Sequence, residues 1–348
     1  MSGAGPPQDA NGAPSGGSAA APAASVGVVC DGRGPIMLGI EGRELTPGDR
    51  ARLADPRVGG VILFARNFVS SAQLRQLTAS IRALRSALLI AVDHEGGRVQ
   101  RFRSDGFTPL PPMRTLGERW DADPVAAQSA AFATGQTIAR ELLAHGVDFS
   151  FAPVLDLDYA ASRVIGDRAF HADPVIVADL AGALLRGLDA GGVAGVAKHF
   201  PGHGYVAADS HVDTPIDDRT LDAILCADIV PFAALMQQGL EAVMPAHIVY
   251  PAVDARPAGF SAVWIGEILR GRLGFDGLVF SDDLEMAGAH SAGDIVARAN
   301  AAISAGCDVV LLCNDFRAMD ELLARWTPPA QPSLARRWAQ MAGRQPQS

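Results

Sequence analysis

The chain of 348 residues lacks a cluster of basic residues: 29 lysines and arginines stand against 38 aspartates and glutamates, giving a net charge of −9. Nucleic-acid binding needs clustered positive charge to meet the phosphates, so we do not expect it here. No apolar run approaches the roughly 20 residues that cross a bilayer. The N-terminus also lacks the basic start and apolar core of a signal peptide. We therefore expect the protein to bind neither nucleic acid nor a membrane.

Cysteine is equally scarce, and its spacing is informative. None of the four cysteines forms a CxxC pair, and the last two lie in an apolar run. This pattern is typical of reduced core thiols in a cytoplasmic protein and not of disulfides or metal ligands. The four residues are Cys30, Cys226, Cys307 and Cys313.

Large apolar residues are almost absent from residues 1–25, which are mostly Gly, Ala, Ser and Pro. Such a segment cannot bury a core, so we predict a disordered tail there. Residues 26–327 are of ordinary size for a single α/β barrel. Residues 328–348 are predicted to form a short helix followed by a frayed end.

Short apolar segments alternate with helical patterns along residues 26–327, and several of these helical patterns end at a glycine. Strands that are apolar throughout are typical of a parallel sheet covered on both faces. A (β/α)8 TIM barrel is the simplest closure. An open, doubly wound sheet is the alternative, but no GxGxxG follows the first strands. The predicted strands are 35–40, 61–64, 88–92, 147–153, 193–197, 242–246, 278–281 and 308–312, and the clearest predicted helices are 70–86 and 124–145.

Nearly every predicted strand ends in an ionisable or amide side chain. In a barrel these ends converge on one rim, which is where active sites are built. The regular placement therefore predicts an enzyme. The residues are Arg66 and Asn67, 93–98, Asp156 and Asp158, Lys198 and His199, His247, Asp282 and Asp283, and Asn314 and Asp315.

Two pairs of residues suggest acid, base or nucleophile roles. Asp282 and Asp283 follow a strand, and either could be a nucleophile or base, or alternatively a helix N-cap. Asp209 lies two residues before His211, and a carboxylate beside an imidazole makes a general acid/base pair. The alternative for this second pair is a chance histidine on a surface loop.

The remaining polar groups suggest ligand binding. Lys198 and His199 could hold hydroxyls or a phosphate, and Asp93 with Arg101 suits vicinal sugar hydroxyls. Arg168 follows the fourth strand, and a surface ion pair is the alternative for each arginine. His203, between two glycines, is predicted to be structural. A metal site is disfavoured because no HExxH occurs. The candidate ligands for such a site are His199, His203, His211, Asp213 and Asp282.

Five motifs in this order resemble the single-domain β-N-acetylhexosaminidases of glycoside hydrolase family 3, the bacterial enzymes of peptidoglycan recycling. The similarity covers about residues 36–315. One departure is His94, where many members have Gln. The motifs are DHEGGRVQRF (Asp93–Phe102), VIGDRAF (Val164–Phe170), KHFPGHG (Lys198–Gly204), DSH (Asp209–His211) and SDDLEM (Ser281–Met286).

The resemblance implies a TIM barrel and a retaining mechanism through a covalent glycosyl-enzyme. It assigns the nucleophile to Asp282, the acid/base to His211 and its partner to Asp209. It implies a small-molecule substrate, a GlcNAc-anhydro-muropeptide. We expect no cofactor and no metal. We expect a monomer. The sugar-binding residues implied by the resemblance are Asp93, Arg101, Arg168, Lys198 and His199.

Three other functions remain as alternatives to a hydrolase of this kind. A glycoside phosphorylase is possible because a neutral histidine does not repel phosphate as a carboxylate would. A catalytically silent sugar-binding protein is disfavoured by the presence of Asp282, His211 and Asp209. A metal-dependent hydrolase is the third, and a chelator would test it.

Overall fold

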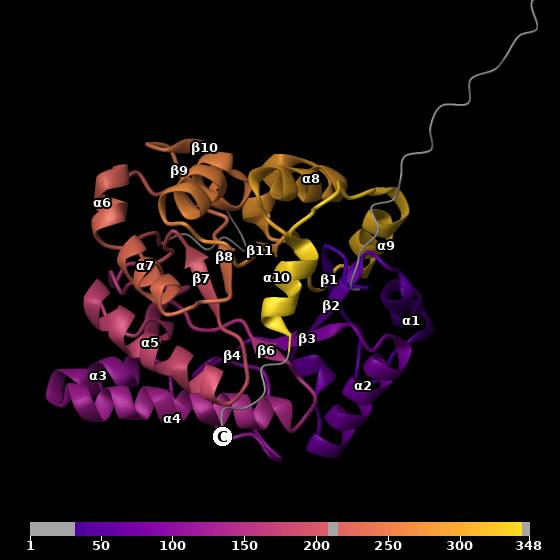
Figure 1. Ribbon diagram of the computed structural model, residues 1–348, viewed down its shortest axis with the longest axis horizontal. Helices are drawn as coiled ribbons and strands as arrows, with labels where there is room; N and C mark the ends of the chain where they lie inside the picture. Colours follow the sequence, from indigo (N-terminus) through magenta and orange to yellow (C-terminus); the bar gives the residue numbers. More distant parts are fainter. Residues whose placement is uncertain (1–31, 208–214, 343–348) are drawn as a thin grey trace, which may run out of the picture.

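A computed structural model describes residues 32–207 and 215–342, and parallel strands form its centre (Figure 1). The eight-stranded sheet has the order β6-β3-β2-β1-β12-β11-β8-β7, so each strand lies beside its neighbour in the chain. The strands are β1 (Ile36–Gly39), β2 (Val58–Leu63), β3 (Leu89–Val92), β6 (Phe149–Ser150), β7 (Val196–Phe200), β8 (Ala242–Pro245), β11 (Leu278–Asp283) and β12 (Val309–Leu312).

The sheet closes on itself between β6 and β7. Val154, just after β6, forms a parallel bridge with Lys198 of β7. The amide of Val196 donates to the carbonyl of Ala152 at 2.8 Å, and the amide of Leu155 donates to Lys198 at 2.7 Å. The predicted TIM barrel is therefore confirmed.

Helices cover the outside of the barrel (Figure 1). Several begin at a polar N-cap, such as Ser70 for α2 and Asp123 for α4, whose side chain accepts a first-turn amide. The predicted helices 70–86 and 124–145 correspond to α2 and α4. The helices are α1 (Pro47–Ala54), α2 (Ser71–Leu84), α3 (Arg114–Ala122), α4 (Pro124–Leu143), α5 (Pro174–Ala190), α6 (Leu221–Cys226), α7 (Ile229–Gln237), the π-helix η4 (Val263–Arg272), α8 (Ile295–Ala305) and α9 (Phe316–Arg325).

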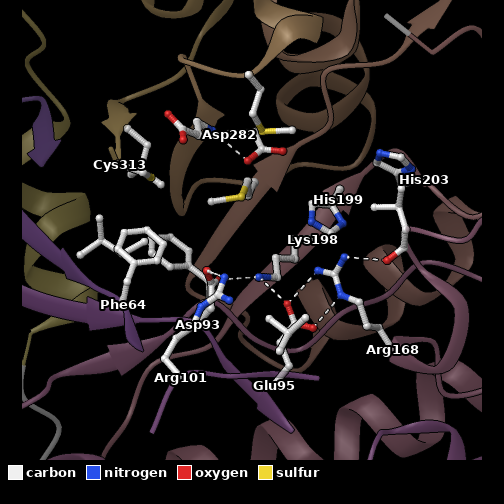
Figure 2. A pocket seen from close by; sticks show the side chains of 18 of the residues that line it. Phe64, Asp93, Glu95, Arg101, Arg168, Lys198, His199, His203, Asp282 and Cys313 are labelled. Carbon is white, nitrogen blue, oxygen red and sulfur yellow. Dashed lines mark hydrogen bonds and ion pairs between the residues drawn. The ribbon is translucent and has the colours of Figure 1, made fainter. Parts of the chain in front are cut away.

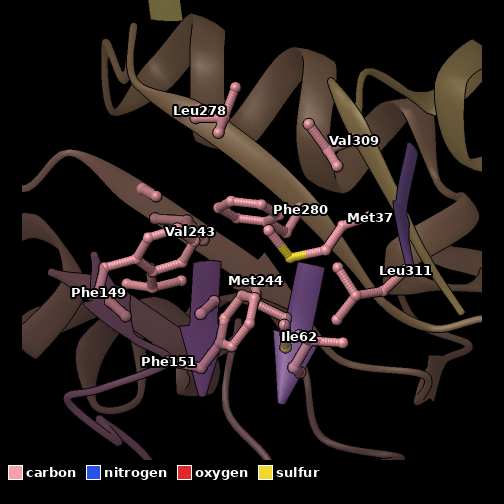
Figure 3. Close-up of a cluster of buried hydrophobic side chains, with 14 of the residues drawn as sticks. Met37, Ile62, Phe149, Phe151, Val243, Met244, Leu278, Phe280, Val309 and Leu311 are labelled. Atoms are coloured by element: carbon pink, nitrogen blue, oxygen red, sulfur yellow. The ribbon is translucent and has the colours of Figure 1, made fainter. Parts of the chain in front are cut away.

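Large apolar side chains fill the barrel interior (Figure 3). The rings of Phe149, Phe151 and Phe280 pack against one another, with centroids 5.2 to 5.8 Å apart. Ile62, Phe151 and Met244 also line the cavity described below. The hydrophobic core is therefore continuous with the lining of that cavity.

A C-terminal helix, α10 (Leu334–Met341), packs at the N-terminal end of the strands. Trp338 is fully buried, its ring packs against Phe280, and its indole donates to the carbonyl of Gly34 at 3.2 Å. A Cβ on Gly59 would lie 2.2 Å from the carbonyl oxygen of Gly34 and 3.0 Å from this indole, so the close approach requires glycine. The helix covers this end of the barrel.

Two strands continue beyond their predicted ends. The strand predicted at 193–197 is β7 (Val196–Phe200), and the one predicted at 278–281 reaches Asp283. Backbone pairing continues where the apolar pattern stops, since Lys198 pairs with Met244 and Asp283 with Leu311. Side chains at these positions line a cavity and need not be apolar. The polar residues therefore lie on strands and not on a loop.

Two short hairpins were not predicted from the sequence. One joins β4 (His94–Gly96) to β5 (Val99–Gln100), and the other joins β9 (Val249–Tyr250) to β10 (Asp254–Pro257). Gly96 and Gly97 turn the first hairpin with φ of 105° and 54°, values that favour glycine. This hairpin carries the first motif into the mouth of the barrel.

The cysteine prediction was partly wrong. Cys307 and Cys313 are buried free thiols, as expected, but Cys226 is exposed. It ends α6, a helix of six residues in which only Ile224 is buried. Cys30 and the predicted N-terminal tail lie outside the described residues. No helix within residues 32–207 and 215–342 is long and apolar enough to span a bilayer.

Candidate active site

A cavity of about 710 Å³ opens at the C-terminal ends of the barrel strands (Figure 2). It is lined from several strands, with Phe64 following β2, His199 on β7 and Asp282 on β11. Six of the predicted site residues meet there: Asp93, Arg101, Arg168, Lys198, His199 and Asp282. Active sites of TIM-barrel enzymes occupy this end of the fold.

Asp93 is held between two cations. Its Oδ1 accepts a hydrogen bond from Lys198 Nζ at 2.8 Å, and its Oδ2 accepts one from Arg101 Nη2 at 3.0 Å. Burial by itself would raise the pKa of Asp93, but the charges of Lys198 and Arg101 outweigh it and hold the pKa well below its ordinary value. Asp93 is therefore an anion that can accept hydrogen bonds from a ligand.

Glu95 is a residue that the sequence analysis did not assign. Its Oε1 lies 2.7 Å from Lys198 Nζ, and both of its oxygens accept from Arg168 at 2.8 Å (Figure 2). The Glu95 side chain is only 2% exposed, and the two cations outweigh burial and lower its pKa. A buried lysine and arginine need a carboxylate partner, and that requirement could have pointed to Glu95 within the first motif.

His199 is fixed by Asp156. Its Nδ1 lies 2.6 Å from Asp156 Oδ2, while Asp156 Oδ1 accepts the backbone amides of His199 and His203. Burial opposes ionisation of Asp156, but the neighbouring His199 lowers its pKa to about 2. A carboxylate on Nδ1 leaves Nε2 of His199 as the nitrogen for a ligand.

His203 lies in the cavity wall, although the sequence analysis treated it as a structural loop residue. Its ring packs edge-on against His199, with centroids 5.7 Å apart. Burial, followed by the nearby His199, lowers the pKa of His203 to about 4. The ring is therefore neutral at pH 7 and adds a polar surface without charge.

Asp282 and Asp283 occupy different environments although they are adjacent. Asp282 Oδ1 accepts the amide of Asp283 at 2.8 Å, and Asp283 Oδ1 accepts the amide of Glu285 at 3.0 Å. Burial and the charge of Glu285 raise the pKa of Asp283 well above its ordinary value. A carboxyl group whose ionised form is disfavoured is the poorer nucleophile of the two, which favours Asp282. Neither residue caps a helix, because the next helix, η5 (Ala287–Ala292), has Met286 at its N-cap.

The predicted acid/base pair lies outside the described residues. Asp209 and His211 fall in the segment 208–214, as does Asp213 of the metal alternative. Within residues 32–207 and 215–342, no three His, Cys, Asp or Glu side chains are grouped as ligands for a metal ion.

His94 is a buried histidine behind the cavity. Its ring packs near Phe102 and Phe107, and neither ring nitrogen has a hydrogen-bond partner in the described part of the chain. Burial lowers its pKa from 6.5 to about 4. The folded state therefore holds His94 neutral where the unfolded chain would bind a proton.

This histidine should make the protein less stable in acid. The pKa of His94 is lower in the folded state than in the unfolded chain, so the unfolded chain binds a proton first as the pH falls. The corresponding part of the unfolding free energy is complete above about pH 6.5 and is lost as the pH falls toward about 4. Between these limits His94 contributes up to about 1.4 kcal/mol per pH unit to the slope of the unfolding free energy against pH. Urea unfolding of the wild type and of His94→Gln at pH 7.5, 6 and 5 measures this. The variant should show the shallower decline, and parallel declines would contradict the assignment.

The geometry defines a TIM barrel whose cavity presents carboxylate, guanidinium, ammonium and imidazole groups that can form hydrogen bonds with a hydroxyl-rich ligand. Residues 38–326 match the family model for the glycosyl hydrolase family 3 N terminal domain. The chain is 61% identical over 306 residues to a β-hexosaminidase of Bordetella avium, covering 87% of each protein. It is 60% identical over 300 residues to a β-hexosaminidase of Aromatoleum aromaticum, covering 86% of this chain and 84% of that one.

Comparison with solved structures leads to the same class of enzyme. NagZ from Neisseria gonorrhoeae, in complex with N-trifluoroacetyl-D-glucosamine, superposes with a TM-score of 0.85 at 51% identity, covering 89% of this chain and 90% of that one. The chain therefore belongs to glycoside hydrolase family 3, in which it groups with the β-N-acetylhexosaminidases.

Proposed function

We propose that this enzyme is a retaining exo-β-N-acetylglucosaminidase that removes the terminal β-1,4-linked GlcNAc of 1,6-anhydro-muropeptides in cell-wall recycling. The observation that carries the proposal is the cavity in which Asp282 meets Asp93, Lys198 and His199. The Neisseria gonorrhoeae NagZ complex, with a glucosamine derivative, supports a sugar of this class.

The paired charges inside the cavity suit recognition of sugar hydroxyls. Asp93 accepts from a hydroxyl, while Arg101, Lys198 and His199 Nε2 can donate to its neighbours. Each of these side chains is already held by a partner, as Lys198 is by Asp93 and Glu95. Little rearrangement is then needed on binding, which favours affinity and correct orientation.

The first chemical step is attack by an Asp282 oxygen on the anomeric carbon. The carbon–oxygen bond to the leaving group breaks as the ester to Asp282 forms, through an oxocarbenium-like state. A proton from His211 goes to the departing oxygen. In the second step, neutral His211 takes a proton from water, whose oxygen displaces Asp282 and restores it as a free carboxylate.

Asp209 is proposed to pair with the imidazole of His211. A carboxylate beside an imidazole favours the protonated form and makes it available as an acid at neutral pH. Most retaining glycosidases use a second carboxyl group for this purpose. Here the assignment depends on the DSH motif alone, because residues 209–211 lie outside the described part of the chain.

Replacing His211 with alanine should slow hydrolysis most for substrates with poor leaving groups. Loss of a general acid costs about 10²-fold or more when the departing oxygen needs a proton, and much less for an activated aryl oxide. Steady-state rates on a series of aryl N-acetyl-β-glucosaminides, ordered by the pKa of the phenol, measure the difference. An equal loss for all leaving groups would count against His211 as the acid.

The proposed function is tested by incubating the enzyme with purified GlcNAc-anhydro-muropeptides and following the release of GlcNAc. A 2-fluoro glycoside should trap the glycosyl-enzyme, and peptide mass spectrometry should place the sugar on Asp282. No release of GlcNAc would reject the substrate, and no adduct would reject the mechanism. Product analysis with phosphate added distinguishes a phosphorylase, which would yield GlcNAc-1-phosphate.

We also propose that the enzyme acts in the cytoplasm as a monomer. The three cysteines of the described residues are free thiols, which suits a reducing compartment. Size-exclusion chromatography with light scattering tests the oligomeric state.

A further inference from the structure

The side chains that line the cavity become more exposed from its floor to its mouth. Lys198 and Glu95 are each 3% exposed, and the Arg101 side chain is 31% exposed. The Arg98 side chain reaches 49%, and Arg163 is exposed. Arg98 and Arg163 both line the cavity, so they lie at its mouth.

The positive charges differ in how far they are neutralised. On the floor, Lys198 and Arg168 share Glu95, and Lys198 and Arg101 share Asp93. At the mouth, Arg98 faces only the half-exposed Asp167, at 3.5 Å. Arg163 forms no ion pair with a carboxylate of the described residues. Among the described residues, the mouth therefore carries excess positive charge, although the whole protein has a net charge of −9.

The backbone under Arg163 is tied down. Arg98 Nη2 donates to the carbonyl of Arg163 at 3.2 Å and also to that of Val164. Arg168 Nη1 donates to the same Val164 carbonyl at 3.2 Å. The segment is thus anchored both to the β4–β5 hairpin and to the buried Glu95 network. Arg163 is presented at the mouth from a fixed backbone.

We propose that Arg163, supported by Arg98, binds an anionic group on the leaving part of the substrate and so selects for carboxylate-bearing aglycones. This proposal rests on the proposed function in one respect: an exo-acting enzyme holds the terminal sugar on the floor, so the mouth faces the aglycone. A guanidinium binds a carboxylate through two parallel hydrogen bonds, which a neutral aglycone does not offer. The peptide of a muropeptide carries such carboxylates.

The experiment uses two aryl N-acetyl-β-glucosaminides of similar shape, one with a 3-carboxyphenyl and one with a 3-carbamoylphenyl leaving group. The readout is the ratio of kcat/KM for the anionic over the neutral substrate. Arg163→Gln should lower this ratio about three- to five-fold, as for an exposed ion pair. Arg163→Lys should retain much of it, and 0.5 M NaCl should reduce the wild-type ratio toward that of Arg163→Gln.

A matched control is Arg272→Gln, which removes the same charge from an exposed arginine at the end of η4, before β11. It should keep the wild-type ratio. The proposal is overturned if Arg163→Gln keeps the wild-type ratio, or if Arg272→Gln lowers it equally. Because both substrates are simple aryl glycosides, a failure to cleave muropeptides would reject the proposed substrate and leave this test valid.

Discussion

Replacing Asp282 with alanine is expected to lower kcat by about 10⁴-fold or more, because no other group in the cavity would form the covalent intermediate. Asp282 lies at the end of β11, and its Oδ1 is held by the amide of Asp283. The binding residues stay in place, so the variant should still bind GlcNAc. Steady-state kinetics with an activated aryl glycoside and calorimetry with GlcNAc measure the two effects separately.

Azide provides a chemical control for this variant. A small anion can enter the space left by the carboxylate and attack the anomeric carbon from the same side. The expected product is the α-azide of N-acetylglucosamine, because a single direct displacement on an activated β-glycoside inverts the anomeric carbon. Asp283→Asn is the matched variant. It should retain far more activity, because burial and the charge of Glu285 already disfavour the ionised form of Asp283 by raising its pKa. Equal losses in the two variants would contradict the assignment.

Replacing Glu95 with glutamine should lower the free energy of unfolding by about 3 to 5 kcal/mol, because it leaves two buried cations without their shared partner. The Lys198 side chain is 4% exposed and that of Arg168 is 10% exposed. The same change should raise KM, since both cations would no longer be held in position. Urea unfolding and steady-state kinetics measure the two effects.

The control for Glu95 is Glu118→Gln, an equal change at an exposed position on α3. It should change the unfolding free energy by less than about 0.5 kcal/mol. If both variants unfolded alike, the Glu95 network would contribute no more than a surface charge does. A destabilised Glu95→Gln with unchanged KM would show that the network supports the fold but does not position the sugar.

Much of the barrel could be predicted because its strands are apolar on both faces. The segments 35–40, 88–92 and 308–312 correspond closely to β1, β3 and β12. Predictions were less accurate where strands carry the site. At β7 and β11 the side chains become polar two or three residues before backbone pairing ends, and composition alone cannot reveal that pairing.

The sequence predicted which residues gather at the candidate site more completely than it predicted the hydrogen bonds and ion pairs among them. The polar strand ends did converge, and Arg66 at one strand end donates to Asn314 at another at 2.7 Å. Glu95 and Asp156 were not assigned, because their importance comes from residues far away in the chain. Glu95 meets Arg168 across 73 positions, and Asp156 meets His199 across 43.

The sequence by itself determined the alternation of strands and helices and the placement of polar residues at strand ends. Through the resemblance of five motifs it also led to the proposal of Asp282, His211 and the sugar-binding residues. These are properties of neighbouring residues and need no distant contact. Only the tertiary structure decided that Glu95 joins Lys198 to Arg168, that the pKa of Asp283 is raised, and that Arg163 stands at the mouth without a counter-charge from the described residues. Burial and the distance between charges set these properties, and both exist only once the barrel has closed.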